Sequence, residues 1–334
     1  MMRSAVVLGG LWLVLGCAAT PPPAPVVVSD GRLVMGTVLE VTLVAPDAEA
    51  GRSALSELFA LVESLEAVFT RFDPASPVSR LNRAAGSGPQ RVDPELALLL
   101  AHARRHAALT DGAFDVTVGP LVALWTGAAA RDVLPSDAEL AATRSQVGWQ
   151  KVRVLSDDEV ALDAAGVSVD LGGVAKGWAL DRARALLAER GLERALLNFG
   201  HSSVWALGRP ADVPTWRLLA RGPGNGFLGV VHLEDLALSV SGSLGQAVEI
   251  GGRRFGHVLD PRTGRALEAR RQALVVGPDA TLAEALSKAL LVLGESEGLA
   301  LVEAQPGCEA LLVDADRGAW RTTGWDALTA FAAF

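Results

Sequence analysis

The sequence predicts an α+β fold, with mixed, largely antiparallel sheets and helices packed against them. Helical periodicity recurs between residues 53 and 190, and a run of short strands follows from 195 to 276. The two kinds of element do not alternate regularly, which argues against a doubly wound parallel sheet. The chain has 334 residues, 50% of them hydrophobic and 20% charged, so it can bury a large core.

The charge of the chain argues against a nucleic-acid partner, and its aromatic content limits which residues can stack on a ligand. The formal net charge is −8, and no basic stripe is visible, so nucleic acid is not an expected partner. Tyrosine is absent, so any aromatic contact to a ligand falls to the eight tryptophans and nine phenylalanines.

The N-terminus has the pattern of a targeting segment. Arg3 precedes an apolar run at 5–15 that is too short to span a bilayer as a mature helix. The run ends at Gly16-Cys17, which resembles a bacterial lipoprotein cleavage site. We therefore expect a lipoprotein signal peptide at 1–16 and a lipidated Cys17 that anchors the protein to the membrane on its extracytoplasmic (periplasmic) side. An ordinary signal peptide with an incidental cysteine is the alternative.

A Pro-rich tether is expected next, at 17–29, followed by one domain at 30–334. Cys308 is the only other cysteine. If Cys17 is acylated no disulfide can form, and Cys308 is predicted to be a buried small hydrophobe.

The first half of the domain is predicted to be mainly helical. Residues 32–43 alternate around Met35-Gly36 and predict a strand, and 53–71 carry the i, i+3, i+4 pattern of an amphipathic helix. Asp93 as N-cap and Pro94 at the first helical position predict a helix to about Leu109. A helix at 136–147 and short strands at 151–155, 160–162 and 167–169 follow.

The second half is predicted to be rich in strands. A helix at 174–190 ends at Gly191, which suits the C′ position. Further helices are expected at 282–293, 298–304 and 325–331. The predicted strands are 195–199, 203–207, 216–220, 229–233, 237–240, 247–250, 255–259, 272–276 and 309–313.

The segment VDLGGVAKGWALD, residues 169–181, carries the first functional signal. An apolar run ends in Asp170, turns through Gly172 and Gly173, and enters a helix with Lys176 in its first turn. Paired glycines let backbone N–H groups approach a ligand, and a helix N-terminus attracts phosphate. A tight strand-to-helix turn without a ligand is the alternative.

Three further segments accompany it: MGT at 35–37, GAFDVTVGPL at 112–121 and HVLDPRTG at 257–264. With VDLGGVAKG, they occur in the order and rough spacing of the bacterial ApbE family, the FAD:protein FMN transferases. FDPASPVSRLN at 72–82 is similar to that family's segment after the first helix. The resemblance runs from about Met35 to the C-terminus and implies an ApbE-like (T-fold-like) architecture.

The resemblance implies covalent protein flavinylation. A Ser or Thr hydroxyl of an acceptor redox protein would attack the FMN-side phosphorus of FAD, and AMP would leave. FAD would be the substrate and Mg²⁺ the metal. Two other functions stay open: a lipoprotein that binds FAD without transfer, and an FAD pyrophosphatase that gives FMN and AMP.

Several positions match the family's flavin-binding residues. Phe72 falls where the family commonly has a stacking tyrosine, and phenylalanine keeps the π-face. Met35 and Phe72 could instead be core residues, Asp115 a cap and Lys176 a solvated lysine. Val258 would contact FAD mainly through its backbone. The implied FAD-binding residues are Met35, Phe72, Ala113, Phe114, Asp115, Asp170, Lys176 and Val258.

His257 and Asp260 are the implied catalytic residues. A histidine titrates near neutrality and can accept a proton from a hydroxyl, and Asp260 could orient it or cap the turn. The sequence DPRTG is also a good turn on its own, which leaves His257 a structural alternative. His102 and His106 are expected to face solvent, with no metal role.

The metal site departs most from the family. The implied metal-site residues are Gly173, Glu284, Ser287 and Lys288. Where the family has an Asp and, four residues on, a Thr, this chain has Glu284 and Lys288, and a protonated lysine cannot be a ligand. Either Lys288 supplies the positive charge and pairs with Glu284 at i, i+4, or the site and its activity are lost. His201 for a glycine and Val240 for a threonine are further departures.

Overall fold

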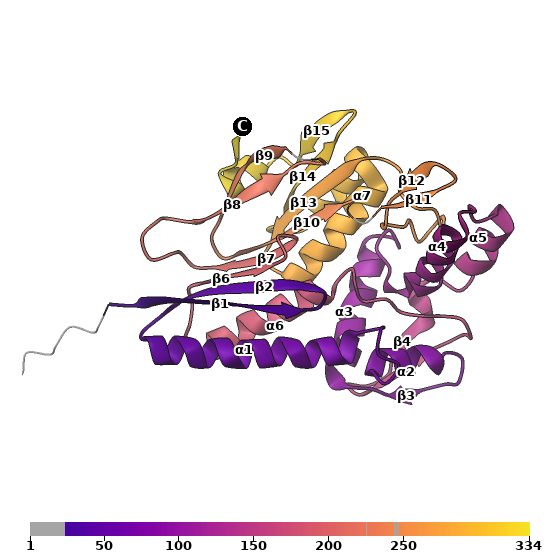
Figure 1. Cartoon of the computed structure of the whole chain (residues 1–334), viewed down its shortest axis with the longest axis horizontal. Helices are drawn as coiled ribbons and strands as arrows, with labels where there is room; N and C mark the ends of the chain where they lie inside the picture. The colour runs from indigo at the N-terminus through magenta and orange to yellow at the C-terminus, as the bar shows by residue number, and fades with distance from the viewer. Residues whose placement is uncertain (1–23, 225, 244, 246) are drawn as a thin grey trace, which may run out of the picture.

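The computed structural model describes residues 24–334 apart from 225, 244 and 246, so the predicted signal peptide and Cys17 lie outside the described residues. An eight-stranded sheet forms the centre, in the order β1-β2-β6-β7-β10-β13-β14-β15 (Figure 1). Every pairing between its described strands is antiparallel, which confirms the predicted fold class. The strands are β1 (Val26–Val34), β2 (Thr37–Ala45), β6 (Ala195–Phe199), β7 (Ser203–Leu207), β10 (Leu236–Gly242), β13 (Arg271–Gly277), β14 (Glu309–Asp314) and β15 (Gly318–Arg321).

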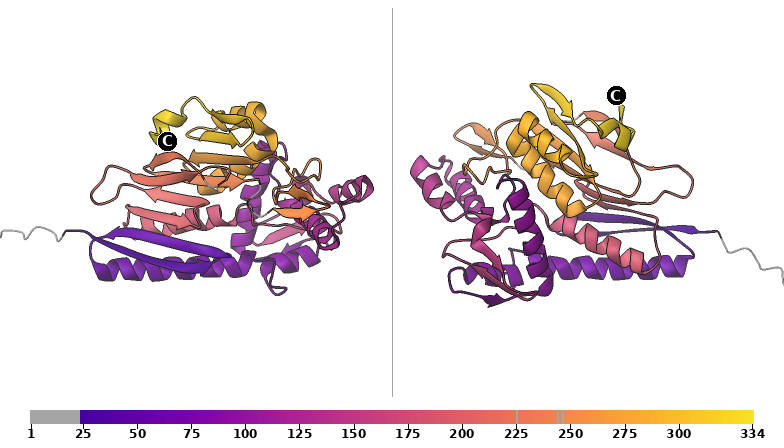
Figure 2. Two further views of the ribbon diagram at one scale, coloured as in Figure 1. Left: turned by 45° about the horizontal axis from the view of Figure 1, so that its top comes forward. Right: turned by 180° about the vertical axis from the view of Figure 1, so that it is seen from behind.

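Three long helices, α1 (Ala48–Phe69), α6 (Ala175–Glu189) and α7 (Ala280–Glu303), lie side by side on one face of this sheet (Figure 2). Gly294 interrupts α7 with non-helical dihedral angles, where the sequence predicts two separate helices. On the other face, a second apolar cluster surrounds the buried Trp325. That layer contains β8 (Trp216–Arg221), β9 (Phe227–Leu233), α8 (Trp325–Thr329) and β16 (Ala332–Ala333).

A smaller lobe lies beside the long helices, at the right of Figure 1. Its helix α3 begins as predicted, because Asp93 accepts a 2.8 Å hydrogen bond from the Glu95 N–H and Pro94 opens the first turn. The lobe contains α2 (Pro77–Arg83), α3 (Pro94–Leu109), α4 (Gly119–Arg131), α5 (Asp137–Arg144), the 3₁₀ turns Val116–Val118 and Trp149–Lys151, the sheet of β3 (Gln90–Arg91), β5 (Glu159–Leu162) and β4 (Val152–Val154), and the hairpin of β11 (Val248–Ile250) and β12 (Arg253–Phe255).

The predicted single strand at 32–43 is wrong: the chain forms the hairpin β1–β2 there. Met35 and Gly36 are its two-residue turn, with φ values of 50° and 75° that match a type I′ turn. The expected tether at 17–29 is also too long, since residues 26–29 pair with 42–45 in this hairpin. Its residues up to 23 lie outside the described part.

Three other element predictions need correction. Residues 167–169 are not a strand, because the side chain of Asn82 bonds both the N–H and the C=O of Val169, at 2.8 and 2.9 Å. Only Phe255 of the predicted strand 255–259 lies in β12, and the predicted closing helix ends at Thr329. None of the helices in the described residues is long and apolar enough to cross a membrane.

His102 and His106 do not face solvent as expected. Both side chains are only partly exposed, and the His102 ring packs edge-on against Trp178 with 5.0 Å between centroids. Burial lowers the pKa of His106 to about 4. Cys308, by contrast, is buried as predicted.

Candidate functional site

The Gly-Gly turn at 172–173 is fixed by hydrogen bonds from two directions. The Asp170 N–H donates to the Val116 carbonyl at 2.7 Å, and the Asp170 carboxylate accepts from the Gly172 N–H at 2.9 Å. Asn82 of α2 holds the preceding residue, as described above. The turn therefore has one defined conformation at the start of α6.

Helices α6 and α7 approach closely just after this turn. A Cβ at Gly177 would lie 2.6 Å from the Ala280 carbonyl oxygen, so only glycine allows this contact. The Asp181 carboxylate accepts hydrogen bonds from the N–H groups of Ala280 and Thr281, both at 2.9 Å. These contacts set the position of Lys176 on α6 relative to α7.

Lys176, His257 and Lys288, which we call the basic cluster, gather beside the turn. A Cβ at Gly173 would lie 4.0 Å from Cε of Lys288, so the lysine stem packs on the turn. Lys176 donates a short hydrogen bond through Nζ to the Ser202 hydroxyl. The structure therefore brings these three predicted residues together.

The charges in the basic cluster act on one another. Burial lowers the pKa of Lys288 to about 8, with Lys176 lowering it further and Glu284 opposing the shift. Burial also lowers the pKa of His257, and the positive charges of Lys288 and Lys176 add to that effect. His257 keeps an exposed surface and is neutral at neutral pH, which suits a proton acceptor.

Glu284 lies beneath the cluster and is only 1% exposed. Its Oε1 accepts a short hydrogen bond from the Ser203 hydroxyl, a partner that the sequence did not identify. Its Oε2 lies 4.0 Å from Lys288 Nζ and has no hydrogen-bond partner in the described part of the chain. The ammonium is therefore the charge that balances this carboxylate.

Ser287 does not fit the predicted metal role. It is fully buried, and its hydroxyl lies 2.9 Å from that of Ser239 and 2.8 Å from that of Ser241, both on β10. Its hydroxyl also donates to the Glu284 carbonyl at 2.9 Å. Val240 points to the opposite face of β10, where it packs against the Trp325 cluster. A threonine hydroxyl at position 240 would therefore point away from the site, so the valine costs the site no hydrogen-bond donor.

Phe72 is 81% exposed, so it is not a core residue. The guanidinium of Arg71 stacks on its ring, 4.7 Å from the centroid, and the Arg71 Nε lies 3.1 Å from Asp170 Oδ2. Arg71, which the sequence analysis missed, thus joins the aromatic ring to the Gly-Gly turn. Met35 is partly buried, and its N–H donates to Glu66 Oε1 at 2.7 Å.

The segment Ala113–Asp115 is buried beside the turn, with Phe114 Cε2 3.7 Å from the Cβ position of Gly173. Asp115 accepts hydrogen bonds from the Thr117 N–H and hydroxyl and from the Trp149 N–H, at 2.7–2.8 Å. Burial raises the pKa of Asp115, and these hydrogen bonds partly oppose that increase. Asp115 therefore caps this loop, and its contact with FAD stays a prediction.

Asp260 acts as the turn cap, one of the two roles considered for it. Its Oδ1 accepts hydrogen bonds from the Arg262 N–H at 2.9 Å and from Arg262 Nε at 3.1 Å. The Val258 carbonyl accepts a hydrogen bond from the Leu267 N–H at 3.0 Å. A carbonyl oxygen can accept a second hydrogen bond, so the backbone contact of Val258 with FAD stays a prediction.

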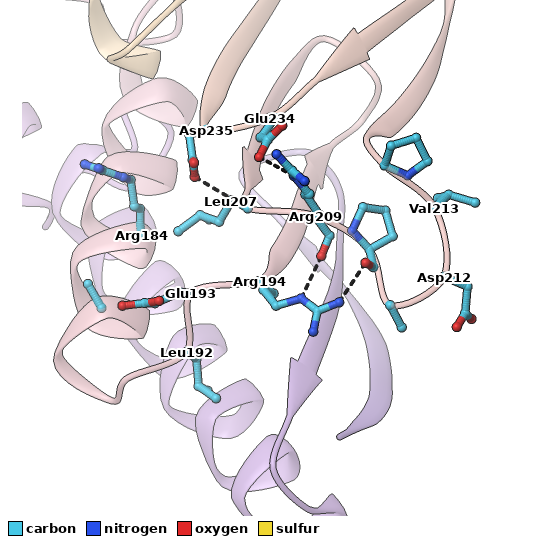
Figure 3. Close-up of a pocket in the computed structure, with 15 residues that line it drawn as sticks. Arg184, Leu192, Glu193, Arg194, Leu207, Arg209, Asp212, Val213, Glu234 and Asp235 are labelled. Carbon is cyan, nitrogen blue, oxygen red and sulfur yellow. Dashed lines mark hydrogen bonds and ion pairs between the residues drawn. The ribbon is translucent and has the colours of Figure 1, made fainter. Parts of the chain in front are cut away.

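A cavity of about 800 Å³ lies at the far end of α6 (Figure 3). Arg194 donates to the carbonyls of Arg209 and Pro210 there, at 2.9 and 2.7 Å, and Arg209 pairs with Glu234. Its lining includes none of the residues predicted for the site. We therefore assign the site to the basic cluster rather than to this cavity.

Comparisons with known proteins identify the family of this chain. The profile of the ApbE family matches residues 35–312. The FAD:protein FMN transferase of Vibrio cholerae is 31% identical over 325 residues, which cover 95% of this chain and 96% of that protein. The protein of the same name from Escherichia coli K12 is 29% identical and covers 90% of this chain and 89% of its own length.

Solved structures show the same fold. The flavin transferase ApbE from Vibrio cholerae superposes with a TM-score of 0.78 at 26% identity, covering 91% of this chain and 99% of that one. The ApbE protein from Thermotoga maritima gives a TM-score of 0.81 at 26% identity, covering 90% and 99%. On its sequence and its fold, the chain belongs to the ApbE family.

Proposed function

We propose that this protein transfers FMN from FAD to a Ser or Thr hydroxyl of an acceptor protein and releases AMP. The observation that carries the proposal is the basic cluster beside the Gly-Gly turn. A lysine ammonium binds phosphate as a point charge, and the helix N-terminus at α6 adds N–H donors. The similarity to FAD:protein FMN transferases over nearly the whole chain supports the same reaction.

In this reaction the acceptor hydroxyl oxygen attacks the phosphorus on the FMN side of the pyrophosphate. A new P–O bond forms as the bond to the bridging oxygen breaks, and AMP leaves with that electron pair. His257 accepts the hydroxyl proton, while Lys176 and Lys288 stabilise the negative charge that builds up on the phosphate oxygens. Phe72 stacks on the flavin ring.

The acceptor would be an exported or membrane redox protein. This follows from the proposed lipid anchor at Cys17, which would hold the domain on the extracytoplasmic side of a membrane. Replacing Cys17 with alanine should then release the protein from membranes. An unchanged distribution between membrane and soluble fractions would contradict the lipid anchor. It would not bear on the proposed FMN transfer.

The reaction can be tested by incubating the protein with FAD and a candidate acceptor domain, followed by intact mass measurement of the acceptor. The proposal predicts a mass gain equal to one phosphoester-linked FMN, with an equal amount of AMP. An acceptor whose target Ser or Thr is replaced by alanine is the control. Release of FMN and AMP without a mass gain would identify a pyrophosphatase, and bound but unchanged FAD would identify a binding protein.

A further inference from the structure

The α7 positions that correspond to the family's carboxylate and hydroxyl pair hold an ion pair in this chain. Lys288 Nζ lies 4.0 Å from Glu284 Oε2, with the carboxyl side chain 1% exposed and the lysine side chain 22% exposed. A buried carboxylate needs a nearby positive charge, because desolvation of an unpaired charge is costly. Here a side chain of the protein provides that charge.

The residues at this position do not fit a divalent metal ion. Mg²⁺ takes six oxygen ligands in near-octahedral geometry, whereas a protonated lysine offers no lone pair. The Ser287 hydroxyl is occupied by its contacts with β10, so only Glu284 of the three predicted metal-site residues on α7 offers a carboxylate. In residues 24–334, with 225, 244 and 246 set aside, no group of three His, Cys, Asp or Glu side chains could hold a metal.

The position of Lys288 points its charge at the phosphate-binding turn. Its stem lies against Gly173, whose Cβ position is 4.0 Å from Lys288 Cε, and the turn leads into the N-terminus of α6, the positive end of the helix dipole. Lys176 approaches from α6, and its charge acts on Lys288 directly. Each phosphate of FAD carries one negative charge, and Lys176, Lys288 and Glu284 together present one net positive charge toward them.

The use of lysine in this chain is selective. Of its 30 basic residues only three are lysines, Lys151, Lys176 and Lys288, and all others are arginine. Lys151 donates to the Val147 carbonyl at 2.8 Å in the smaller lobe. The two remaining lysines both belong to the basic cluster. A compact ammonium, rather than a planar guanidinium, is what can replace a small cation.

We propose that the Lys288 ammonium, held by Glu284, occupies the place of a divalent cation at the FAD pyrophosphate, so that this protein binds FAD without a metal. The inference rests on the proposed function for its choice of ligand. Catalysis would then draw its electrostatic stabilisation of the phosphate oxygens from Lys288 and Lys176.

The test measures the Kd of the full-length chain for FAD in EDTA and in excess Mg²⁺. We expect the wild-type Kd to agree within about twofold between the two conditions. Lys288→Thr should weaken binding in EDTA by about tenfold, the loss of one charge-assisted contact. The variant Glu284→Asp with Lys288→Thr restores the family's pair and should bind tightly only with Mg²⁺.

Two controls keep the result interpretable. Glu284→Gln with Lys288→Gln removes both charges and leaves no unpaired buried ion, so weak binding in a folded protein cannot be attributed to unfolding. Arg52→Thr removes one exposed positive charge near the start of α1 and should leave the Kd unchanged. Circular dichroism of each variant verifies the fold.

A wild-type Kd that rises at least about tenfold in EDTA and recovers with Mg²⁺ would overturn the inference, as would equal Kd values for Lys288→Thr and wild type. The absence of FAD binding in both conditions would overturn it as well. Metal-independent, Lys288-dependent binding without any FMN transfer would support the inference and contradict the proposed function, so the two can fail separately.

Discussion

Lys288 Nζ lies 4.0 Å from Glu284 Oε2, and the two residues are four apart on α7, one helical turn. Removing Lys288 alone would leave the Glu284 carboxylate, which is only 1% exposed, without a positive charge beside it. The pair therefore links the stability of α7 to the chemistry of the site.

Lys288→Gln should lower the free energy of unfolding by about 3 kcal/mol, because a buried ion loses its partner. The double variant Glu284→Gln with Lys288→Gln should recover most of that loss, since no unpaired charge remains. Urea unfolding at neutral pH measures both. Equal stability of the single variant and the wild type would show that the carboxylate is not balanced by this lysine.

Phe72→Ala should leave the free energy of unfolding within about 0.5 kcal/mol, because this side chain is 81% exposed. The same variant should weaken FAD binding by about tenfold, since it removes the stacking surface. Phe72→Tyr keeps the ring and should bind like the wild type. If FAD binds Phe72→Ala with unchanged affinity, the ring does not contact the flavin.

The pH dependence of transfer should report His257. Burial, followed by Lys288 and Lys176, lowers its pKa below 6.5. A base acts when unprotonated, so kcat/KM, which reports the pKa of the free enzyme, should fall as the pH drops through a midpoint below 6.5. Removing the Lys288 charge in the double glutamine variant should move this midpoint upward. A midpoint above 6.5, or one that the variant does not move, would argue against His257 as the base.

The stability of the fold should fall in acid because of His106. Its pKa is lowered from 6.5 to about 4, so the unfolded state binds the proton first. The stability that this neutral histidine contributes is complete above pH 6.5 and decreases by about 3 kcal/mol as the pH falls to 4. His106→Phe should flatten the curve of unfolding free energy against pH over this window. An unchanged slope would mean that other groups cause the acid sensitivity.

Local signals were enough to predict several elements of the fold. Asp93-Pro94 determines the start of α3 through a cap and a ring-fixed dihedral angle, so the sequence places it correctly. The Met35-Gly36 turn was missed because a non-glycine residue with φ of 50° gives no local signal. The residues that follow continue the same alternation, which hides the reversal of the chain.

The site was predictable where a motif is contiguous and less so where distant elements meet. The i, i+4 spacing alone indicates that Glu284 and Lys288 can pair. The burial of Ser287 depends on two serines of β10, some 46 residues away, and the role of Arg71 depends on Asp170. These contacts form only when the chain has folded, so no local sequence pattern predicts them.

The most direct test of the account is the rate at which an acceptor domain gains the mass of FMN from FAD in the presence of EDTA, measured for the wild type and for His257→Ala. We predict a steady gain by the wild type without added metal, and a large loss of rate in the variant. If the acceptor gains no mass under any condition, or gains it equally fast with His257→Ala, the proposed transfer mechanism is contradicted.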